Sequence, residues 1–176
     1  MKRSSLAERP CPVARASAQL VDAWSFVILR ELYFGNRRFE GLRQHTGMSP
    51  RSLALRLAWL VEQRILEKAA CKDAPAFMEY RLTPKGLDLW PVMVMLRQWG
   101  ERWGGAPAAS IPRLMHRGRG HELVPVLSCR TCGEQVDARS GEVHFTEAGL
   151  CGRPAADAGA AAAAGTPRRS GARAAG

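Results

Sequence analysis

The apolar residues in the first part of the chain recur at helical spacing in several separate runs. Residues 13–23 form a modest amphipathic run, and a strongly apolar run begins at Trp24 and ends at Gly35. Gly35 is followed by asparagine, and this pair can adopt the left-handed conformation that closes a helix. A shorter run begins at about Phe39 and ends near Gly47. The pattern therefore predicts a succession of short helices.

The stretch "SPRSLALRLAWL", residues 49–60, predicts a further helix with a clear beginning. Ser49 can accept a hydrogen bond from a free N–H of the first turn, and Pro50 gives up a donor that has no partner there. At about 100° per residue, one stripe of the helix is suited to a core, whereas the opposite side is sparse. The stripe contains Leu53, Leu57, Leu60 and Val61, and the opposite side contains Arg51, Leu55 and Ala58, with Arg56 on a flank.

Two short runs that resemble strands, residues 65–71 and 77–82, follow this helix and flank the turn-forming "KDAPA". Two helices joined by a short turn indicate a helix-turn-helix, and a hairpin directly after it is typical of a wing. The fold is therefore expected to be mainly α with a small antiparallel β-hairpin.

A long helix is predicted from Thr83, a capping residue, to about Trp103, with a kink at Pro91. The composition changes after Gly104, and from residue 155 the chain is rich in Ala and Gly and too poor in large apolar groups to fold. No internal repeat is visible. We expect a winged helix-turn-helix domain over residues 11–104, a small extension containing Cys and His over 105–154, and a disordered tail over 155–176.

Charge favours a polyanionic partner, because 26 Lys and Arg residues against 16 Asp and Glu give a net charge of +10. No apolar run approaches the ~20 residues of a membrane-spanning helix, and the N-terminus does not resemble a secretion signal. The five cysteines are irregularly spaced. We therefore expect a cytoplasmic protein with reduced thiols and no membrane partner.

Several segments occur in the order found in one bacterial family. These segments are "CPVARA", "DAWSFVILREL", "RRFEGLR", "SPRSLALRLAWL" and "FMEYRLTPKG" followed by "LRQWGERW". Over roughly residues 11–103 the chain resembles the HxlR-type winged helix-turn-helix regulators. The resemblance implies a homodimeric transcription factor that binds a pseudo-palindromic site on double-stranded DNA. It implies neither enzyme activity nor a required cofactor, and it does not identify the effector.

The resemblance also assigns candidate DNA contacts. Arg51 and Arg56 occupy the family's two basic positions on the recognition helix, and Ser49, Ser52 and Leu55 accompany them. Independently of the resemblance, the basic residues around the hairpin are either contacts to the DNA backbone or solvated surface charges: Arg37, Arg38, Lys72 and Arg81.

Other positions depart from the family. The positions of Ala54, Leu55 and Ala58 are usually polar or basic, and Phe77 stands where the wing usually carries a basic residue. Weaker DNA binding or an altered sequence preference is expected. The alternative function is a winged helix that binds another protein, with Leu55 and Trp59 in an apolar contact patch.

The turn after the recognition helix contains Gln63-Arg64 where the family usually has Asp-Gly. If Arg64 must adopt a positive φ, the turn costs on the order of 1 kcal/mol.

Cys11 matches the family's N-terminal cysteine, which senses electrophiles or oxidants in several members. Such sensing requires a thiolate, and the alternative is an inert, half-buried thiol. Cys71, on a predicted wing strand, is expected to be a small apolar filler.

The extension contains candidate metal ligands: His116, His121, Cys129 and Cys132. A C-x-x-C followed by glycine directs two thiolates at one ion, which indicates structural zinc. Some longer family members have a similar tail, usually with a cysteine where Arg119 stands. Four-coordination here would therefore need both histidines, or Cys151. The alternatives are a lost zinc module with exposed thiols, or redox chemistry.

Overall fold

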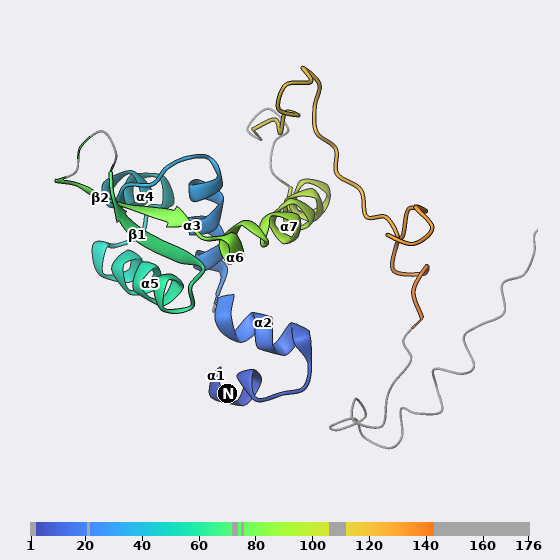
Figure 1. The fold of residues 1–176 in the computed structure, drawn as a ribbon, viewed down its shortest axis with the longest axis horizontal. Coiled ribbons are helices and arrows are strands. Elements are labelled where there is room, and N and C mark those ends of the chain that lie inside the picture. The colour runs from blue at the N-terminus through green and yellow to red at the C-terminus, as the bar shows by residue number, and fades with distance from the viewer. Residues whose placement is uncertain (1–2, 21, 72–73, 75, 106–111, 143–176) are drawn as a thin grey trace, which may run out of the picture. The chain divides into compact units, whose positions relative to one another are not determined.

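The computed structural model describes residues 3–20, 22–71, 74, 76–105 and 112–142. Its helices and strand pair follow the order expected for a winged helix-turn-helix (Figure 1). The elements are α1 (Arg3–Ala7), α2 (Pro12–Leu20), α3 (Ala23–Tyr33), α4 (Phe39–Thr46), α5 (Pro50–Glu62), β1 (Leu66–Ala70), β2 (Met78–Leu82), α6 (Pro84–Leu87) and α7 (Trp90–Trp103).

The hydrophobic core forms where α3, α4 and α5 meet. Its fully buried side chains include Ile28 and Leu29 of α3, Leu42 of α4, and Leu53 and Leu57 of α5. Since α3 contacts α4, α5 and β2, it is the central element of this domain. The leucine stripe predicted for α5 is confirmed, because each of its leucines faces the core.

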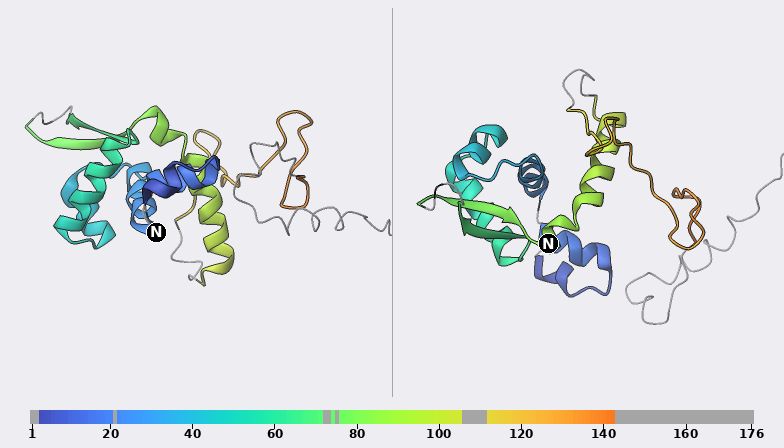
Figure 2. Two further views of the ribbon diagram at one scale, coloured as in Figure 1. Left: turned by 90° about the horizontal axis from the view of Figure 1, so that it is seen from below. Right: turned by 45° about the horizontal axis from the view of Figure 1, so that its top comes forward.

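The wing is an antiparallel hairpin in which Leu66 pairs with Leu82 and Ala70 pairs with Met78. The N–H of Tyr80 donates to the carbonyl of Arg37 at 2.9 Å, so the loop before α4 is attached to β2. The hairpin runs along one side of α5 and projects beyond it (Figure 2). The expected fold, mainly α with one small hairpin, is confirmed.

The predicted cap of α5 is also confirmed. Ser49 has extended backbone, and its hydroxyl oxygen accepts the N–H of Ser52 at 3.2 Å. Pro50 is the first residue of the helix.

The predicted helix from Thr83 to Trp103 is wrong in one respect, because the segment forms two helices and not one kinked helix. Thr83 caps α6 by accepting the N–H of Gly86, and α6 ends at Leu87. Pro91 lies in the first turn of α7. A proline there needs no hydrogen-bond partner for its nitrogen, so it favours a new helix start over a kink.

Because Gly86 has no side chain, α6 can lie close to the end of the turn between α5 and β1. A side-chain Cβ at this position would lie 2.3 Å from the carbonyl oxygen of Ile65. The Gly86 carbonyl in turn accepts the hydroxyl of Tyr33 at 2.5 Å. Burial raises the pKa of Tyr33 to about 12, and nearby Asp88 adds to this shift. The bond from Tyr33 therefore ties α6 to α3.

The turn between α5 and β1 contains a left-handed residue, at the position where the resembled family usually has glycine. Arg64 has φ +56°, and its N–H donates to the carbonyl of Val61 at 2.9 Å. A side chain with Cβ is disfavoured in this region by about 1–2 kcal/mol.

Replacing Arg64 by glycine should raise the free energy of unfolding by about 1 kcal/mol, because glycine adopts this conformation without the Cβ clash. Urea denaturation followed by circular dichroism measures the change. Arg64→Ala is the control, because it removes the charge and retains the strain. A gain shared equally by the two variants would contradict the backbone explanation.

Candidate nucleic-acid interface

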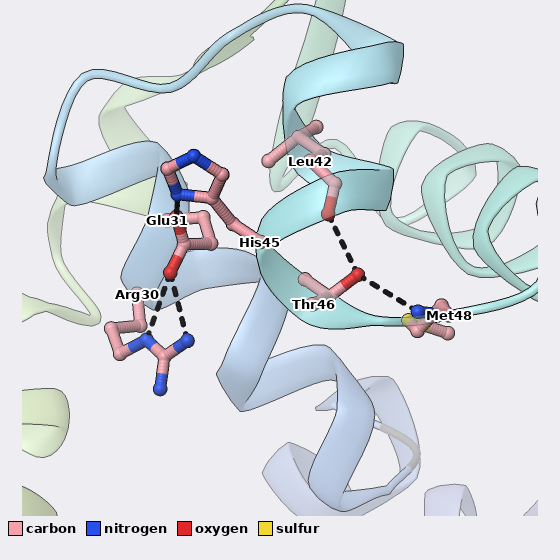
Figure 3. Close-up of polar contacts among 6 residues, drawn as sticks. All are labelled: Arg30, Glu31, Leu42, His45, Thr46 and Met48. Atoms are coloured by element: carbon pink, nitrogen blue, oxygen red, sulfur yellow. Dashed lines mark hydrogen bonds and ion pairs between the residues drawn. The ribbon is translucent and has the colours of Figure 1, made fainter.

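The turn between α4 and α5 fixes the direction in which α5 leaves the core. Thr46 donates its hydroxyl to the carbonyl of Leu42 at 2.7 Å, and the N–H of Met48 donates to the Thr46 oxygen at 3.4 Å (Figure 3). Gly47 closes α4 with φ +69°. Because Met48 is buried, both sides of the turn are anchored.

A buried carboxylate joins α3 to α4 beside this turn. Glu31 is only 4% exposed, and it accepts two hydrogen bonds from Arg30, the shorter at 2.8 Å (Figure 3). Its other oxygen lies 3.1 Å from Nδ1 of His45 on α4. The side chain of His45 is itself largely exposed. The Glu31 contacts therefore hold α4 on α3.

The outward face of α5 is as sparse as the sequence suggested. Arg51, Ser52 and Leu55 are exposed, and Leu55 is 61% exposed. The hydroxyl of Ser49 donates to that of Ser52 at 3.0 Å in addition to capping the helix. This face therefore offers one guanidinium, a pair of hydroxyls and one large apolar side chain.

Arg56, the other predicted contact on α5, is engaged within the protein. Its guanidinium lies 2.5 Å from the carboxylate of Asp22, and the two side chains are 30% and 27% exposed. The other oxygen of Asp22 accepts the N–H of Ser25 at 3.2 Å and caps α3. Arg56 therefore links α5 to the start of α3.

Predicted backbone contacts gather around a buried acid at the end of the strand pair that borders the wing loop. Glu79 on β2 is 7% exposed, and its carboxylate lies 2.5 Å from Nε of Arg81 and 4.0 Å from Arg37. The hydrogen bond from Arg81 lowers the pKa of Glu79, and the charge of Arg37 adds to this effect. Arg37 remains 54% exposed. It can therefore still face a phosphate.

Arg38 lies beside the same end of the wing. It contacts the sulfur of Cys71 at 3.5 Å and lies 5.7 Å from the centre of the Phe77 ring. Cys71 is buried, as expected for an apolar filler. Lys72, the remaining predicted wing contact, lies outside the described residues.

Cys11 is exposed and immediately precedes α2, where its carbonyl accepts the N–H of Arg15 at 3.1 Å. Its exposure allows contact with an electrophile. Its sensing role stays a prediction.

In the extension, the structure gathers the candidate ligands into two separate turns. Cys129 and Cys132 share one turn, and His116 and His121 share another, where their ring centres are 5.2 Å apart. Within the described residues, no three His, Cys, Asp or Glu side chains form a group that could hold a metal. Hydrogen bonds from the N–H groups of Cys132 and Thr131 lower the pKa of Cys129.

Sequence reasoning missed the three carboxylates that organise this surface. Asp22 had a usable signal, because an aspartate three residues before Ser25 at the start of an apolar run is a typical N-cap. Glu31 and Glu79 had none, since their partners are set by tertiary packing.

A family model, the HxlR-like helix-turn-helix, matches residues 19–107. The chain belongs to this family. Among its HxlR-like relatives, an uncharacterized HTH-type transcriptional regulator of Mycobacterium tuberculosis, Rv3095, is 37% identical over 128 residues, which cover 73% of this chain and 81% of the relative. A second, sll1512 of Synechocystis, is 33% identical over 94 residues, which cover 53% of this chain and 70% of the relative.

Two solved structures share the fold. PA1607, described as a candidate transcription factor, has a TM-score of 0.71 and 36% identity, with 81% of this chain and 99% of that chain covered. PA1374 of Pseudomonas aeruginosa has a TM-score of 0.52 and 28% identity, with 78% and 93% covered. This HxlR-like chain is thus related to transcriptional regulators and not to enzymes. None of the described helices is long and apolar enough to cross a membrane.

Glu79 should make the wing sensitive to acid. Because its folded-state pKa is depressed below the ordinary value of 4.5, it contributes stability above that pH and loses the contribution as the pH falls through the folded value. Chemical denaturation should therefore show Glu79→Gln less stable than the wild type at neutral pH, with the difference shrinking toward pH ~3. Glu62→Gln, at the exposed end of α5, is the control. A pH-independent difference would contradict the assignment.

Proposed function

We propose that this HxlR-like protein is a homodimeric transcriptional regulator that inserts α5 into the major groove of a pseudo-palindromic DNA site. The observation that carries the proposal is the exposed N-terminal half of α5, with Arg51, Ser52 and Leu55 outward and the leucine stripe buried beneath them.

The dimensions and chemistry of α5 fit this role. A major groove about 12 Å wide admits one helix, and the first turns of a recognition helix supply the base contacts. Arg51 can donate to guanine or to a phosphate, and Leu55 can contact a thymine methyl group. Arg56 is paired with Asp22 and therefore contributes by fixing α5 on α3.

The wing supplies the sequence-independent part of binding. Arg37 and Arg38 immediately precede α4 and lie beside the loop end of the wing, and both side chains are exposed. Arginines in such positions contact phosphates, which fixes the register of a protein on the duplex. The guanidinium of Arg81 is less available to a phosphate than that of Arg37, because it donates hydrogen bonds to Glu79 and to the carbonyl of Ala70.

The apolar face of α7 supports the homodimer. Val92, Leu96, Trp99 and Trp103 are between 45% and 69% exposed. Their spacing alternates between four and three residues, which is the pattern of a helix that packs against another helix. Trp90 is not part of this face, because it packs on Tyr33 with ring centres 5.4 Å apart. A second copy of α7 would cover these side chains.

Fluorescence anisotropy with the promoter duplex of the protein's own gene tests the DNA contact. The affinity of the wild type should fall steeply between about 50 and 200 mM salt as counterions return to the phosphates. Arg51→Ala should lose about 1–3 kcal/mol of binding free energy if Arg51 reads a base. A phosphate contact would instead show as a salt slope lower by about one.

Two further arginine variants are compared with Arg51→Ala. Arg139→Ala, in the exposed extension, should bind like the wild type. Arg56→Ala should weaken binding without changing the salt slope, because Asp22 already neutralises its guanidinium. Equal affinities for Arg51→Ala and Arg139→Ala would refute insertion of α5. An absence of binding at the lower salt would favour a protein-contact role for Leu55.

Light scattering tests the dimer separately. The wild type should have the mass of two chains, and Leu96→Glu should shift it to one, because a carboxylate would be buried between the α7 helices. Leu87→Glu, a similarly exposed leucine on α6, is the control and should remain dimeric. A monomeric wild type would rule out the proposed dimer.

A further inference from the structure

The extension contains a structural repeat that the sequence did not reveal. In residues 114–123, the N–H of His116 donates to the carbonyl of His121 and that of Leu123 donates to Leu114. The same two bonds recur 13 positions later: Cys129 donates to Glu134, and Val136 donates to Leu127. The isolated bridges Met115–Glu122 and Ser128–Gln135 follow the same offset. The two segments are therefore copies of one hairpin, which we call knuckle A (114–123) and knuckle B (127–136).

The turns of the two knuckles also match. Gly120 in knuckle A has φ +71°, and Gly133 in knuckle B has φ +77°. Under the same offset, His116 corresponds to Cys129 and Arg119 corresponds to Cys132. The positions that hold the two thiols in knuckle B are thus held by one metal-binding side chain and one arginine in knuckle A.

Knuckle B has the geometry of a metal-binding turn. The N–H of Gly133 donates to the carbonyl of Cys129 at 2.8 Å, and the N–H of Cys129 in turn donates to the carbonyl of Glu134 at 2.8 Å, so one tight turn carries both cysteines. Both cysteines are free, and Cys132 is exposed, so the pair is accessible to an ion.

Knuckle A presents its histidines in the same manner. Nδ1 of His116 lies 3.2 Å from the carbonyl of Arg117, and Nδ1 of His121 lies 2.9 Å from the carbonyl of Glu122. A carbonyl only accepts, so either contact, as a hydrogen bond, uses the Nδ1–H and leaves Nε2 as the nitrogen that would face an ion. A backbone carbonyl that orients the ring in this way is the usual support of a histidine that binds a metal.

We propose that knuckles A and B close around one zinc ion, with Cys129 and Cys132 from knuckle B and His116 and His121 from knuckle A as its four ligands. Two thiolates and two imidazoles form a tetrahedral set of the kind that structural zinc takes. Arg119 cannot coordinate zinc, so His121 would supply the second ligand of knuckle A in its place. The ion would bring together two hairpins joined only by residues 124–126.

The zinc module would lie beside the proposed dimer helix. Gln98 on α7 donates to the carbonyl of Pro125 at 2.8 Å, between the two knuckles, and Arg97 donates to the carbonyl of Pro112 at 2.6 Å, just before knuckle A. Zinc binding would therefore order a segment already attached to α7. The proposal does not depend on DNA binding.

Metal analysis of the full-length protein, followed by cobalt substitution, tests this site. The wild type should hold one zinc per chain, and its cobalt form should show the absorption of a tetrahedral site with sulfur ligands. Replacing both Cys129 and Cys132 by serine should abolish binding. His116→Ala should weaken zinc affinity by roughly tenfold or more, as loss of a ligand or of its support does.

A gain of affinity gives the sharper test, because it cannot arise from misfolding. Arg119→Cys restores a thiol at the position equivalent to Cys132, and it should bind zinc at least about tenfold more tightly than the wild type. Arg117→Cys is the matched control. It adds a thiol to the same turn at the position equivalent to Arg130, so it should leave the affinity unchanged.

Three outcomes would overturn the proposal. The first is a wild type that lacks zinc after reconstitution while both thiols react freely with a thiol reagent. The second is equal zinc affinity in Arg119→Cys and Arg117→Cys. The third is one zinc for every two chains, which would exclude closure of the two knuckles within one chain. One zinc per chain, lost with the cysteines and tightened only by Arg119→Cys, would support it.

Discussion

Burial of the leucine stripe of α5 against α3 and α4 is the constraint on which the rest of this molecule depends. Leu53, Leu57 and Leu60 are fully enclosed, and each such side chain contributes about 1.5–3 kcal/mol when removed from water. Burying these positions determines which residues of α5 face outward. The same helix leads through Arg64 into the hairpin, so the core sets the position of the wing as well.

The sequence predicted much of this domain because its signals are local. The Ser49 cap, the period of α5, the strand pair and the strained Arg64 each follow from a few adjacent residues. The break between α6 and α7 was missed because a proline inside an apolar run fits either a kink or a new helix start. Only the packing of Gly86 against Ile65 and Tyr33 distinguishes a new helix start from a kink.

The candidate surface was less predictable, since its arginines are distributed by long-range pairing. Asp22 is distant in sequence from Arg56, and it decides that this arginine is partly occupied while Arg51 is exposed. Glu79 similarly engages Arg81 more than Arg37. The repeat in the extension was hidden for a different reason. Few of its paired positions have the same residue, and the likeness lies in backbone hydrogen bonds and glycine conformation.

The sparse outer face of α5 has a consequence for how a regulator of this design distinguishes its targets. One arginine, two serines and a leucine give few donors for base edges. In the proposed complex, discrimination between operators would then depend more on groove width and on how easily the duplex bends between half-sites. Base pairs that the protein never touches would carry much of the information, and related regulators could diverge in target by changing dimer geometry while α5 stays the same.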